Sequence, residues 1–280
     1  MNYTTLFLRS LLIGAADIVP GVSGGTMALI TGLYEQLTRL IATVAKTPGN
    51  ILRTRTLTPL KDIEWRFALT LASAVIIAFI LASKLLVPLI TNYPGPVYAL
   101  FCGLIFGAGI LMLLGYTKRV THTLGALTGF ALGALVVFIP QTHTELAPAA
   151  LLALGGAAGF VMLLPGVSGS YLLLVTGTYT DMLAAVAQPL AHIPILAVFA
   201  LGVAIGIILA ALSVQTLLKT RRNSTLTFLA GIMLGALITP LMTVSQSVTS
   251  TASMILPAAL FIAGIILSRV LWRQERSPNT

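Results

Sequence analysis

Charged residues are scarce in this chain of 280 residues. Asp, Glu, Lys and Arg make up only 8% of the sequence, whereas apolar residues make up 57%, and the mean hydropathy is +1.01. In soluble domains, about a quarter of the residues are charged. The shortage of charge therefore excludes an ordinary soluble domain and indicates an all-α, polytopic membrane protein.

Cysteine and histidine are also rare. Cys102 is the only cysteine and lies in an apolar stretch, so the chain can form neither an internal disulfide nor a cysteine-based metal site. The three histidines, His122, His143 and His192, lie at the ends of different predicted spans, which excludes a shared metal site. No base stands beside the serines of the motif described next, so a serine nucleophile is not indicated. We expect no metal, no cofactor and no enzymatic activity.

The sequence does contain a duplicated motif. The pentapeptide PGVSG occurs at 20–24 and returns at 165–169, a shift of 145 residues. A second pair of segments, 103–110 and 231–238, aligns at a shift of 128 residues. Both copies of the pentapeptide lie between two apolar segments, a pattern typical of a membrane helix that is broken at a ligand site. The chain is therefore expected to be two copies of one structural unit.

Each copy is expected to contain one helical hairpin followed by three transmembrane helices. The first repeat covers 1–140 and the second covers 141–280. In the first hairpin, a largely apolar arm of 14 residues at 6–19 precedes the turn, and a second arm at 26–45 follows it. Crossing a bilayer takes roughly 20 residues, so each hairpin is expected to be re-entrant. The expected elements are hairpins at 6–46 and 147–187, spans at 67–90, 97–117 and 120–139, and spans at 195–218, 225–245 and 253–271.

Basic residues are absent from half of the predicted connections. Fifteen of the sixteen Lys and Arg residues fall on one side of the predicted topology, most of them in 46–66, 118–119 and 219–222. Because positive charge is retained in the cytoplasm, this side and both termini are expected to be cytoplasmic. A non-crossing hairpin and three spans make an odd number of crossings, so the second repeat is expected to be inverted. The net charge of +9 is thus explained by the membrane topology, and no motif indicates binding to nucleic acid.

The two hairpin turns are expected to meet near the middle of the membrane, because they enter it from opposite sides. Proline favours the first turn of a helix, and glycine lets the backbone direct several N–H groups toward one point, where an anion is attracted. We therefore predict a ligand site between the turns. The alternative is that the motif only allows a sharp turn between packed helices. The predicted binding residues are Gly21, Val22, Ser23, Gly24, Gly25 and Thr26 in the first turn and Gly166, Val167, Ser168, Gly169, Ser170 and Tyr171 in the second.

One acidic residue, Asp17, lies within the first apolar arm and is replaced by Met162 in the second repeat. A carboxylate in the membrane is unfavourable and by default suggests a function, here the binding of a coupling ion. The alternative is an acid that hydrogen-bonds the adjacent turn. Two auxiliary candidates are Arg9, in the same arm, and Glu35, which shares a helical face with Arg39 near the membrane interface. For Glu35, the competing interpretation is an ordinary solvated or arginine-paired acid.

The sequence around both motifs resembles the bacterial polyprenyl-phosphate transporter family. The resemblance rests on GAADIVPGVSGGTMALITGLYE at 14–35, MLLPGVSGS at 162–170 and GTY at 177–179, and it extends over nearly the whole chain. It implies a flippase that returns undecaprenyl phosphate from the outer to the inner leaflet of the bacterial cytoplasmic membrane, for reuse in peptidoglycan and other envelope polymers. The identity of the lipid comes from the resemblance alone, whereas the residues themselves indicate an inverted-repeat transporter with an anion site.

A phosphate head group poses a charge problem at this site. Two helix starts together offer about one positive charge, whereas a phosphate monoester carries about −1.5 to −2 near neutral pH. We therefore expect Asp17 to take up a proton or a sodium ion when the head group enters, and Arg9 to assist release on the cytoplasmic side. Two other functions stay open at this point, a membrane-embedded enzyme acting on a lipid phosphate and a transporter of small anions. The number of subunits is not predicted.

Overall fold

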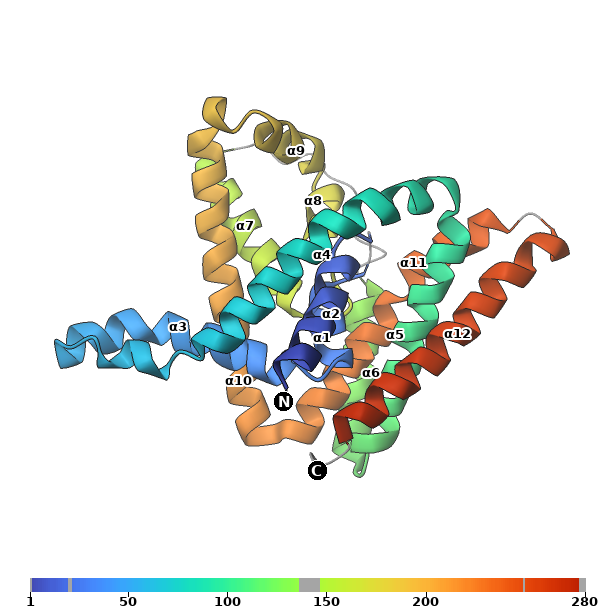
Figure 1. Ribbon diagram of the computed structural model, residues 1–280, viewed down its shortest axis with the longest axis horizontal. Helices are drawn as coiled ribbons and strands as arrows, with labels where there is room; N and C mark the ends of the chain where they lie inside the picture. Colours follow the sequence, from blue (N-terminus) through green and yellow to red (C-terminus); the bar gives the residue numbers. More distant parts are fainter. Residues whose placement is uncertain (1, 20–21, 136–146, 249, 277–280) are drawn as a thin grey trace.

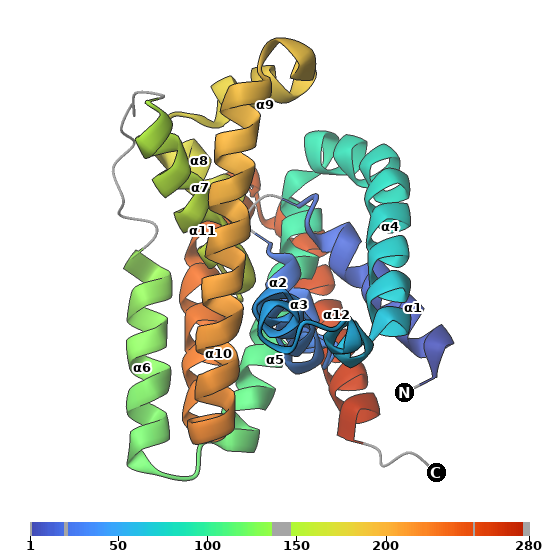
Figure 2. The same ribbon diagram turned by 90° about the vertical axis from the view of Figure 1, so that its left-hand side faces the viewer.

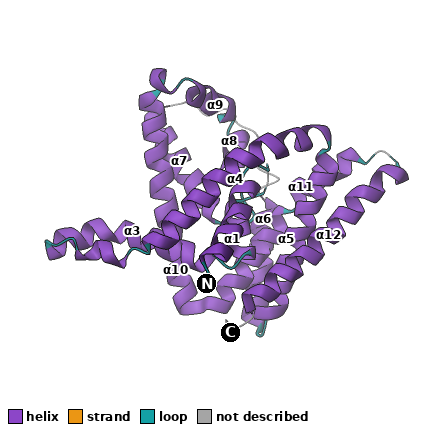
Figure 3. Ribbon diagram, in the orientation of Figure 1, coloured by secondary structure: helices purple, strands orange, loops and turns teal. Residues whose placement is uncertain are grey.

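The computed structural model describes residues 2–19, 22–135, 147–248 and 250–276. Figure 1 shows these residues as helices joined by short connections, and Figure 3 shows no strand among them. The prediction of an all-helical protein with several apolar helices is therefore confirmed. Gly21 and most of the predicted connection 140–147 lie outside the described residues. Residues 20–26 are called the first turn below, and residues 165–171 the second turn.

The two halves follow the same order of elements. The first half contains α1 (Tyr3–Ala16), α2 (Gly24–Ile30), α3 (Tyr34–Thr54), the 3-10 helix η1 (Thr58–Asp62), α4 (Trp65–Asn92), α5 (Pro94–Tyr116) and α6 (Val120–Leu135). The second half contains α7 (Pro148–Leu163), α8 (Gly169–Val175), α9 (Tyr179–Ala187), the 3-10 helix η3 (Pro189–Ala191), α10 (Ile193–Ala236), α11 (Ile238–Ser247) and α12 (Thr251–Arg276). α8 follows α2 by 145 residues at both ends, and α10 begins 128 residues after α4, so the helices repeat at the two shifts found in the sequence.

The second arm of each hairpin is not one helix. The arm expected at 26–45 is divided into α2 and α3, because Gly32 adopts a left-handed conformation, with φ of +74°, that ends α2. Gly177, with φ of +69°, separates α8 from α9 in the same way. α3 also continues to Thr54, into the segment 46–66 that was expected to be a polar connection. Each hairpin therefore consists of a helix of 14 or 16 residues, a turn, a helix of seven residues and a further helix.

The spans predicted at 195–218 and 225–245 are joined without a loop. α10 runs from Ile193 to Ala236, and Arg221 departs from helical geometry, with φ of −141° and ψ of 52°. Figure 1 shows that the chain bends at the lower end of α10 and returns upward. α10 therefore has a first limb before Arg221 and a second limb after it, and the loop expected at 219–224 is absent.

Four helical stretches of the described residues are long and apolar enough to cross a membrane. They are Trp65–Asn92, Pro94–Tyr116, Ile193–Ser247 and Ser253–Arg273. The shorter apolar helices are α1, α6 and α7. α6 covers the first 16 residues of the span predicted at 120–139, whose last four residues lie outside the described part of the chain. This set of helices fits a multi-pass membrane protein.

The two hairpins lie toward opposite ends of the molecule. In Figures 1 and 2, the start of α1, the end of α12, the connection between α5 and α6, and the bend of α10 lie toward the lower end, whereas α9 lies at the upper end. In Figure 1, α3 extends outward in the lower half. The basic segments 46–66, 118–119 and 219–222 belong to these lower elements. An inverted repeat would have this arrangement, and its relation to a membrane stays a prediction.

Glycines allow the long helices to pack at close range. A side chain at Gly14 of α1 would collide with the carbonyl oxygen of Val75 in α4. A side chain at Gly159 of α7 would collide with the carbonyl oxygen of Val203 in α10, which is the same contact at the two repeat shifts. α6 packs on the second limb of α10 and α5 packs on α12, so the last helix of each half lies against the other half. The two halves are therefore interlocked.

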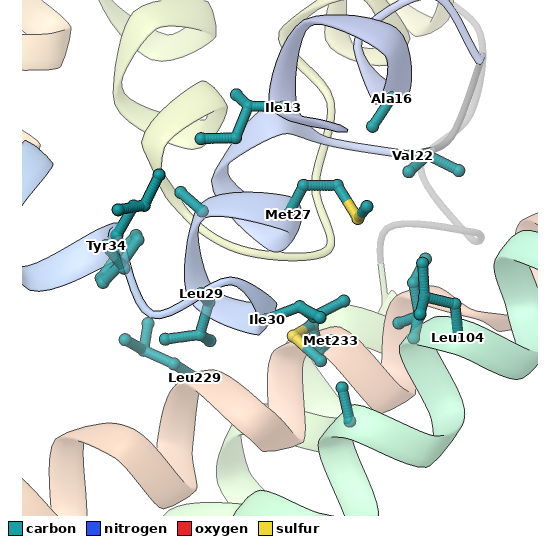
Figure 4. Close-up of a cluster of buried hydrophobic side chains, with 14 of the residues drawn as sticks. Ile13, Ala16, Val22, Met27, Leu29, Ile30, Tyr34, Leu104, Leu229 and Met233 are labelled. Carbon is teal, nitrogen blue, oxygen red and sulfur yellow. The ribbon is translucent and has the colours of Figure 1, made fainter. Parts of the chain in front are cut away.

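α2 lies inside this assembly, and all seven of its residues are buried. Figure 4 shows Met27 and Ile30 of α2 in one apolar cluster with Leu104 of α5 and with Leu229 and Met233 of the second limb of α10. Between membrane helices such contacts stabilise chiefly through close van der Waals packing, because lipid chains are as apolar as these side chains. The short helix that follows the first turn is therefore held by packing against both halves.

Candidate functional site

The two repeated turns contact each other. The backbone N–H of Gly166 donates a hydrogen bond to Oγ1 of Thr26 at 2.6 Å. The hydroxyl group of Ser23 donates to the carbonyl oxygen of Met162 at 3.3 Å. The first turn is thus bound to the second turn and to the end of α7, so the expected convergence of the two hairpins is found in the structure.

The start of α2 is already hydrogen-bonded within its own hairpin. Ser23 is the N-cap of α2, and its Oγ accepts a hydrogen bond from the N–H of Gly25 at 3.2 Å. The N–H of Gly24 donates to Oδ1 of Asp17 at 2.6 Å. The alternative stated for Asp17, an acid that hydrogen-bonds the adjacent turn, is therefore what the structure shows. Two N–H groups that sequence reasoning assigns to an anion are occupied by the protein itself.

The predicted binding residues of the first turn are buried where they are described. This holds for Val22, Ser23, Gly24, Gly25 and Thr26. Ser23 is 3% exposed and Thr26 is fully buried, so neither hydroxyl group is open to a ligand. Asp17, by contrast, is an exposed residue, although its carboxylate lies against the N–H of Gly24. In this hairpin the structure therefore places an exposed acidic residue beside a buried turn.

The second turn is more open. Ser168 is the N-cap of α8, but its side chain makes no capping hydrogen bond, and its Oγ lies 2.7 Å from Oγ of Ser170. Ser170 is exposed and Ser168 is half-buried. Gly166 adopts φ of +93° and packs against the backbone of Met233, which fixes the path of the turn. The other predicted residues of this turn are partly exposed: Val167, Gly169 and Tyr171.

Arg9, the candidate for head-group release, contacts the opposite end of α2. Its Nη1 donates a hydrogen bond to the carbonyl oxygen of Thr31 at 2.9 Å. Thr31 is the C-cap residue of α2, where carbonyl groups lack helical partners and a cation is favourable. Arg9 therefore fixes α2 to α1 in this structure.

Glu35 forms an ion pair, but its partner differs from the one that helical spacing suggests. Its Oε1 lies 2.5 Å from Nη2 of Arg222, at the start of the second limb of α10. The helical spacing had suggested Arg39 instead. The guanidinium carbon of Arg222 also lies 5.5 Å from the centre of the Tyr116 ring. Sequence reasoning missed Arg222 as a partner because 187 residues separate it from Glu35. The basic cluster at 219–222 was the one feature of the sequence that could have indicated a partner for this acid.

This ion pair lines a cleft of about 450 Å³ between α3, α5, α10 and α12, called the basic-side cleft below. Arg39, Glu64 and Trp272 also line it. In the part of the chain that the structure describes, no three His, Cys, Asp or Glu side chains are grouped as metal ligands. The polar side chains that line the cleft carry carboxylate, guanidinium, amide, phenol and indole groups.

Comparison with known proteins gives the family. The family described as VCA0040-like, undecaprenyl phosphate translocase-like, matches residues 13–266. The chain is 34% identical over 239 residues to the polyprenyl-phosphate transporter of Vibrio cholerae serotype O1 (strain ATCC 39315 / El Tor Inaba N16961), covering 85% of this chain and 77% of that protein. It is 26% identical over 283 residues to the polyprenyl-phosphate transporter of Staphylococcus aureus (strain NCTC 8325 / PS 47), covering 95% of each. No solved structure matches the chain significantly.

The matched region contains both turns and the residues of the basic-side cleft except Trp272. It also spans most of the helices of both halves. The chain therefore belongs to the VCA0040-like family of undecaprenyl phosphate translocase-like proteins.

Proposed function

We propose that this protein is a polyprenyl-phosphate transporter that returns undecaprenyl phosphate from the outer to the inner leaflet of the bacterial cytoplasmic membrane. The observation that carries the proposal is the family match over 13–266, together with two relatives that are named transporters and not enzymes. The contact between Gly166 and Thr26 supports it, because polar turns from two halves that meet among apolar helices are typical of a transporter binding site.

The head group is assigned to the side of the site formed by the second turn. Ser168 and Ser170 place two hydroxyl groups 2.7 Å apart at an accessible position, and Tyr171 follows them. Phosphate oxygens accept strong hydrogen bonds from such donors. The first turn, which is buried, supports this site through the contact of Thr26 with Gly166. The predicted binding residues thus divide into a contacting group and a supporting group.

Coupling to a proton or a sodium ion is assigned to Asp17. Asp17 is an exposed residue whose Oδ1 accepts a hydrogen bond from Gly24, and the other carboxylate oxygen is the one we assign to the cation. An ionised carboxylate near a phosphate is repulsive, and a bound proton or sodium ion removes that repulsion. Uptake of the anionic lipid would then be linked to the ion gradient.

Transport is tested with purified protein in liposomes that contain a fluorescent short-chain polyprenyl phosphate in both leaflets. Protein-dependent movement of the lipid raises the fraction that an impermeant reductant bleaches from outside. The double variant S168A/S170A should lose this movement, whereas Ser83→Ala, at a partly exposed serine of α4, should retain it. Equal transport by both variants would contradict the head-group assignment.

The same liposomes separate the other two functions. Release of inorganic phosphate from the lipid would indicate an enzyme, and uptake of inorganic phosphate without lipid movement would indicate a transporter of small anions. A fluorescent polyprenol without phosphate is the control compound. If it moved as fast as the polyprenyl phosphate, the phosphate group would not be recognised.

Orientation in the cytoplasmic membrane is tested with single cysteines in a Cys102→Ala background, since Cys102 is buried. Thr56 and Leu190 are both exposed, in the basic segment 46–66 and in the segment 180–194 without basic residues. With both termini cytoplasmic, an impermeant reagent outside the cell should label Leu190→Cys and should label Thr56→Cys only after permeabilisation. The reverse pattern would overturn the assigned orientation.

A further inference from the structure

The basic-side cleft holds charged groups that the proposed function leaves unused. Arg39 and Arg222 line it, and so do Glu35 and Glu64. Glu35 is paired with Arg222, and Glu64 accepts a hydrogen bond from Nε2 of Gln36 at 2.8 Å. The formal charges of these four ionic groups cancel, so the cleft as it stands is not strongly attractive to an anion. Release of Arg222 from Glu35 would change this.

The cleft lies at the other end of α2 from the two turns. Leu29, at the end of α2, and Gly32, just after it, line the cleft, whereas Gly24 begins α2 at the first turn. Seven residues of helix span about 10 Å at 1.5 Å per residue. The cleft is therefore one short helix away from the turns, on the side where the basic residues gather.

Arg222 is held in a geometry that suits phosphate. A guanidinium group binds phosphate oxygens through paired N–H groups, more specifically than an ammonium group does. The guanidinium group is near the Tyr116 ring, and Tyr116 contacts Trp272 edge-on with ring centres 6.1 Å apart. Because Arg222 and Glu35 are 49% and 38% exposed, their ion pair contributes little to stability and can exchange.

We propose that the basic-side cleft is a second phosphate site, in which Arg222 and Arg39 bind the phosphate monoester of the lipid after it leaves the turns. Glu35 competes with the phosphate for Arg222, so it keeps the site neutral when empty and promotes release when occupied. Arg222 follows the bend of α10 and Glu35 lies in the first turn of α3, so phosphate binding also breaks this ion pair between the first hairpin and the second half. This inference rests on the proposed function, whose substrate it follows one step further.

If Glu35 and the phosphate compete for Arg222, substitutions of Glu35 and Arg222 should change phosphate binding in opposite directions. Replacing Arg222 by Gln removes a phosphate ligand, and the loss of a charge-assisted bidentate contact should weaken binding about tenfold or more. Replacing Glu35 by Gln removes the competitor and should strengthen binding by about threefold, as expected for an exposed ion pair. If the ion pair were merely structural, both variants would weaken binding.

Trp272 provides a local probe, because it lines the cleft and the chain has only one other tryptophan, Trp65. In a Trp65→Phe background, the fluorescence of Trp272 is titrated in nanodiscs with farnesyl phosphate, farnesol and inorganic phosphate. Farnesyl phosphate should change the signal, and farnesol should not. A response to inorganic phosphate at the same concentrations would identify free phosphate as the ligand and overturn the lipid assignment.

The variants E35Q, R222Q and R39Q are titrated in the same background, and R53Q is the matched control. Arg53 is an exposed residue of the same helix as Glu35, so R53Q makes the same change of charge away from the cleft. Weaker binding in R222Q and R39Q with tighter binding in E35Q is the expected result. Weaker binding in both E35Q and R222Q, or unchanged binding in R222Q and R39Q, would overturn the proposal.

The outcome for this cleft is separable from the outcome for transport. If wild-type protein moves polyprenyl phosphate in liposomes but Trp272 does not respond, the second site is wrong and the proposed function stands. If neither transport nor any response to farnesyl phosphate is observed, the proposed function fails first, and the cleft proposal fails with it.

Discussion

The first and second turns share the pentapeptide PGVSG but differ in their surroundings. Ser23 in the first turn is buried, and its side chain caps α2. Its counterpart Ser168 is half-buried, makes no capping hydrogen bond and contacts the hydroxyl group of Ser170. The first turn is fixed by bonds to Asp17 and to the end of α7. Duplication of a sequence therefore does not duplicate its surroundings, since packing of the neighbouring helices decides which copy remains accessible.

The residues that flank the pentapeptide explain much of this difference. Gly25 occupies the position of Ser170, and a Cβ atom there would lie 3.0 Å from the carbonyl oxygen of Leu163, so glycine allows α7 to approach. Asp17 occupies the position of Met162, and its carboxylate binds the N–H of Gly24. Substitutions in the two turns test this difference, and the substitution of Gly166 is expected to have the largest effect.

Replacing Gly166 by Ala should have the largest effect on stability. The residue has φ of +93°, and a Cβ atom would lie 2.8 Å from Cα of Met233. Backbone strain and overpacking together should destabilise the protein by about 3 kcal/mol or more. Gly156→Ala is the control, because its Cβ would meet only the carbonyl oxygen of Gly202 at 3.7 Å. Similar thermal unfolding midpoints of the two variants in detergent would contradict the strain argument.

Exchanging the residue after the pentapeptide should destabilise the protein to different extents in the two turns. Gly25→Ser places a side chain against the carbonyl oxygens of Leu163 and Met162 and should destabilise by about 1–3 kcal/mol. Ser170→Gly removes an exposed side chain near the start of α8 and should destabilise by less than about 1 kcal/mol. Thermal unfolding of the two variants measures the difference. If Ser170→Gly is the more damaging change, the two turns do not differ as described.

The two serines of the pentapeptide should affect different properties, Ser23 the stability of the protein and Ser168 its transport activity. Ser23→Ala removes a helix cap and should destabilise by about 1 kcal/mol, with transport by the folded protein largely kept. Ser168→Ala removes no cap, but loss of a hydrogen bond to a charged head group should reduce transport by about tenfold. The liposome assay, normalised to monodisperse protein, tests both variants. A greater loss of transport in Ser23→Ala would assign the head group to the first turn.

Asp17→Asn should have the smallest effect on stability, since the amide oxygen can still accept the hydrogen bond from Gly24. The change removes the charge that binds a proton or sodium ion. We expect transport to lose its dependence on pH or sodium while the unfolding midpoint changes little. Met162→Leu, at the corresponding position of α7, is the control and should retain the dependence. Wild-type ion dependence in Asp17→Asn would show that Asp17 only supports the turn.

Local patterns in the sequence predicted the helices well. Apolar runs predicted α4, α5 and α12, and the repeated pentapeptide predicted the beginnings of α2 and α8. The break after α2 was missed although Thr31-Gly32 is repeated as Thr176-Gly177. A glycine in this setting is compatible with a continuous helix, and the sequence alone does not reveal its positive φ.

Composition and repetition by themselves determined that this is a helical membrane protein of two similar halves, because apolar content and repeat spacing are properties of the chain. Which copy of the pentapeptide is buried was decided by tertiary packing, since α2 is enclosed by helices of both halves while Ser170 is exposed. The pairing of Glu35 with Arg222 was decided in the same way. Two exposed charges separated by 187 residues carry no local signal of their contact, which exists because α3 and the bend of α10 are brought together by the fold.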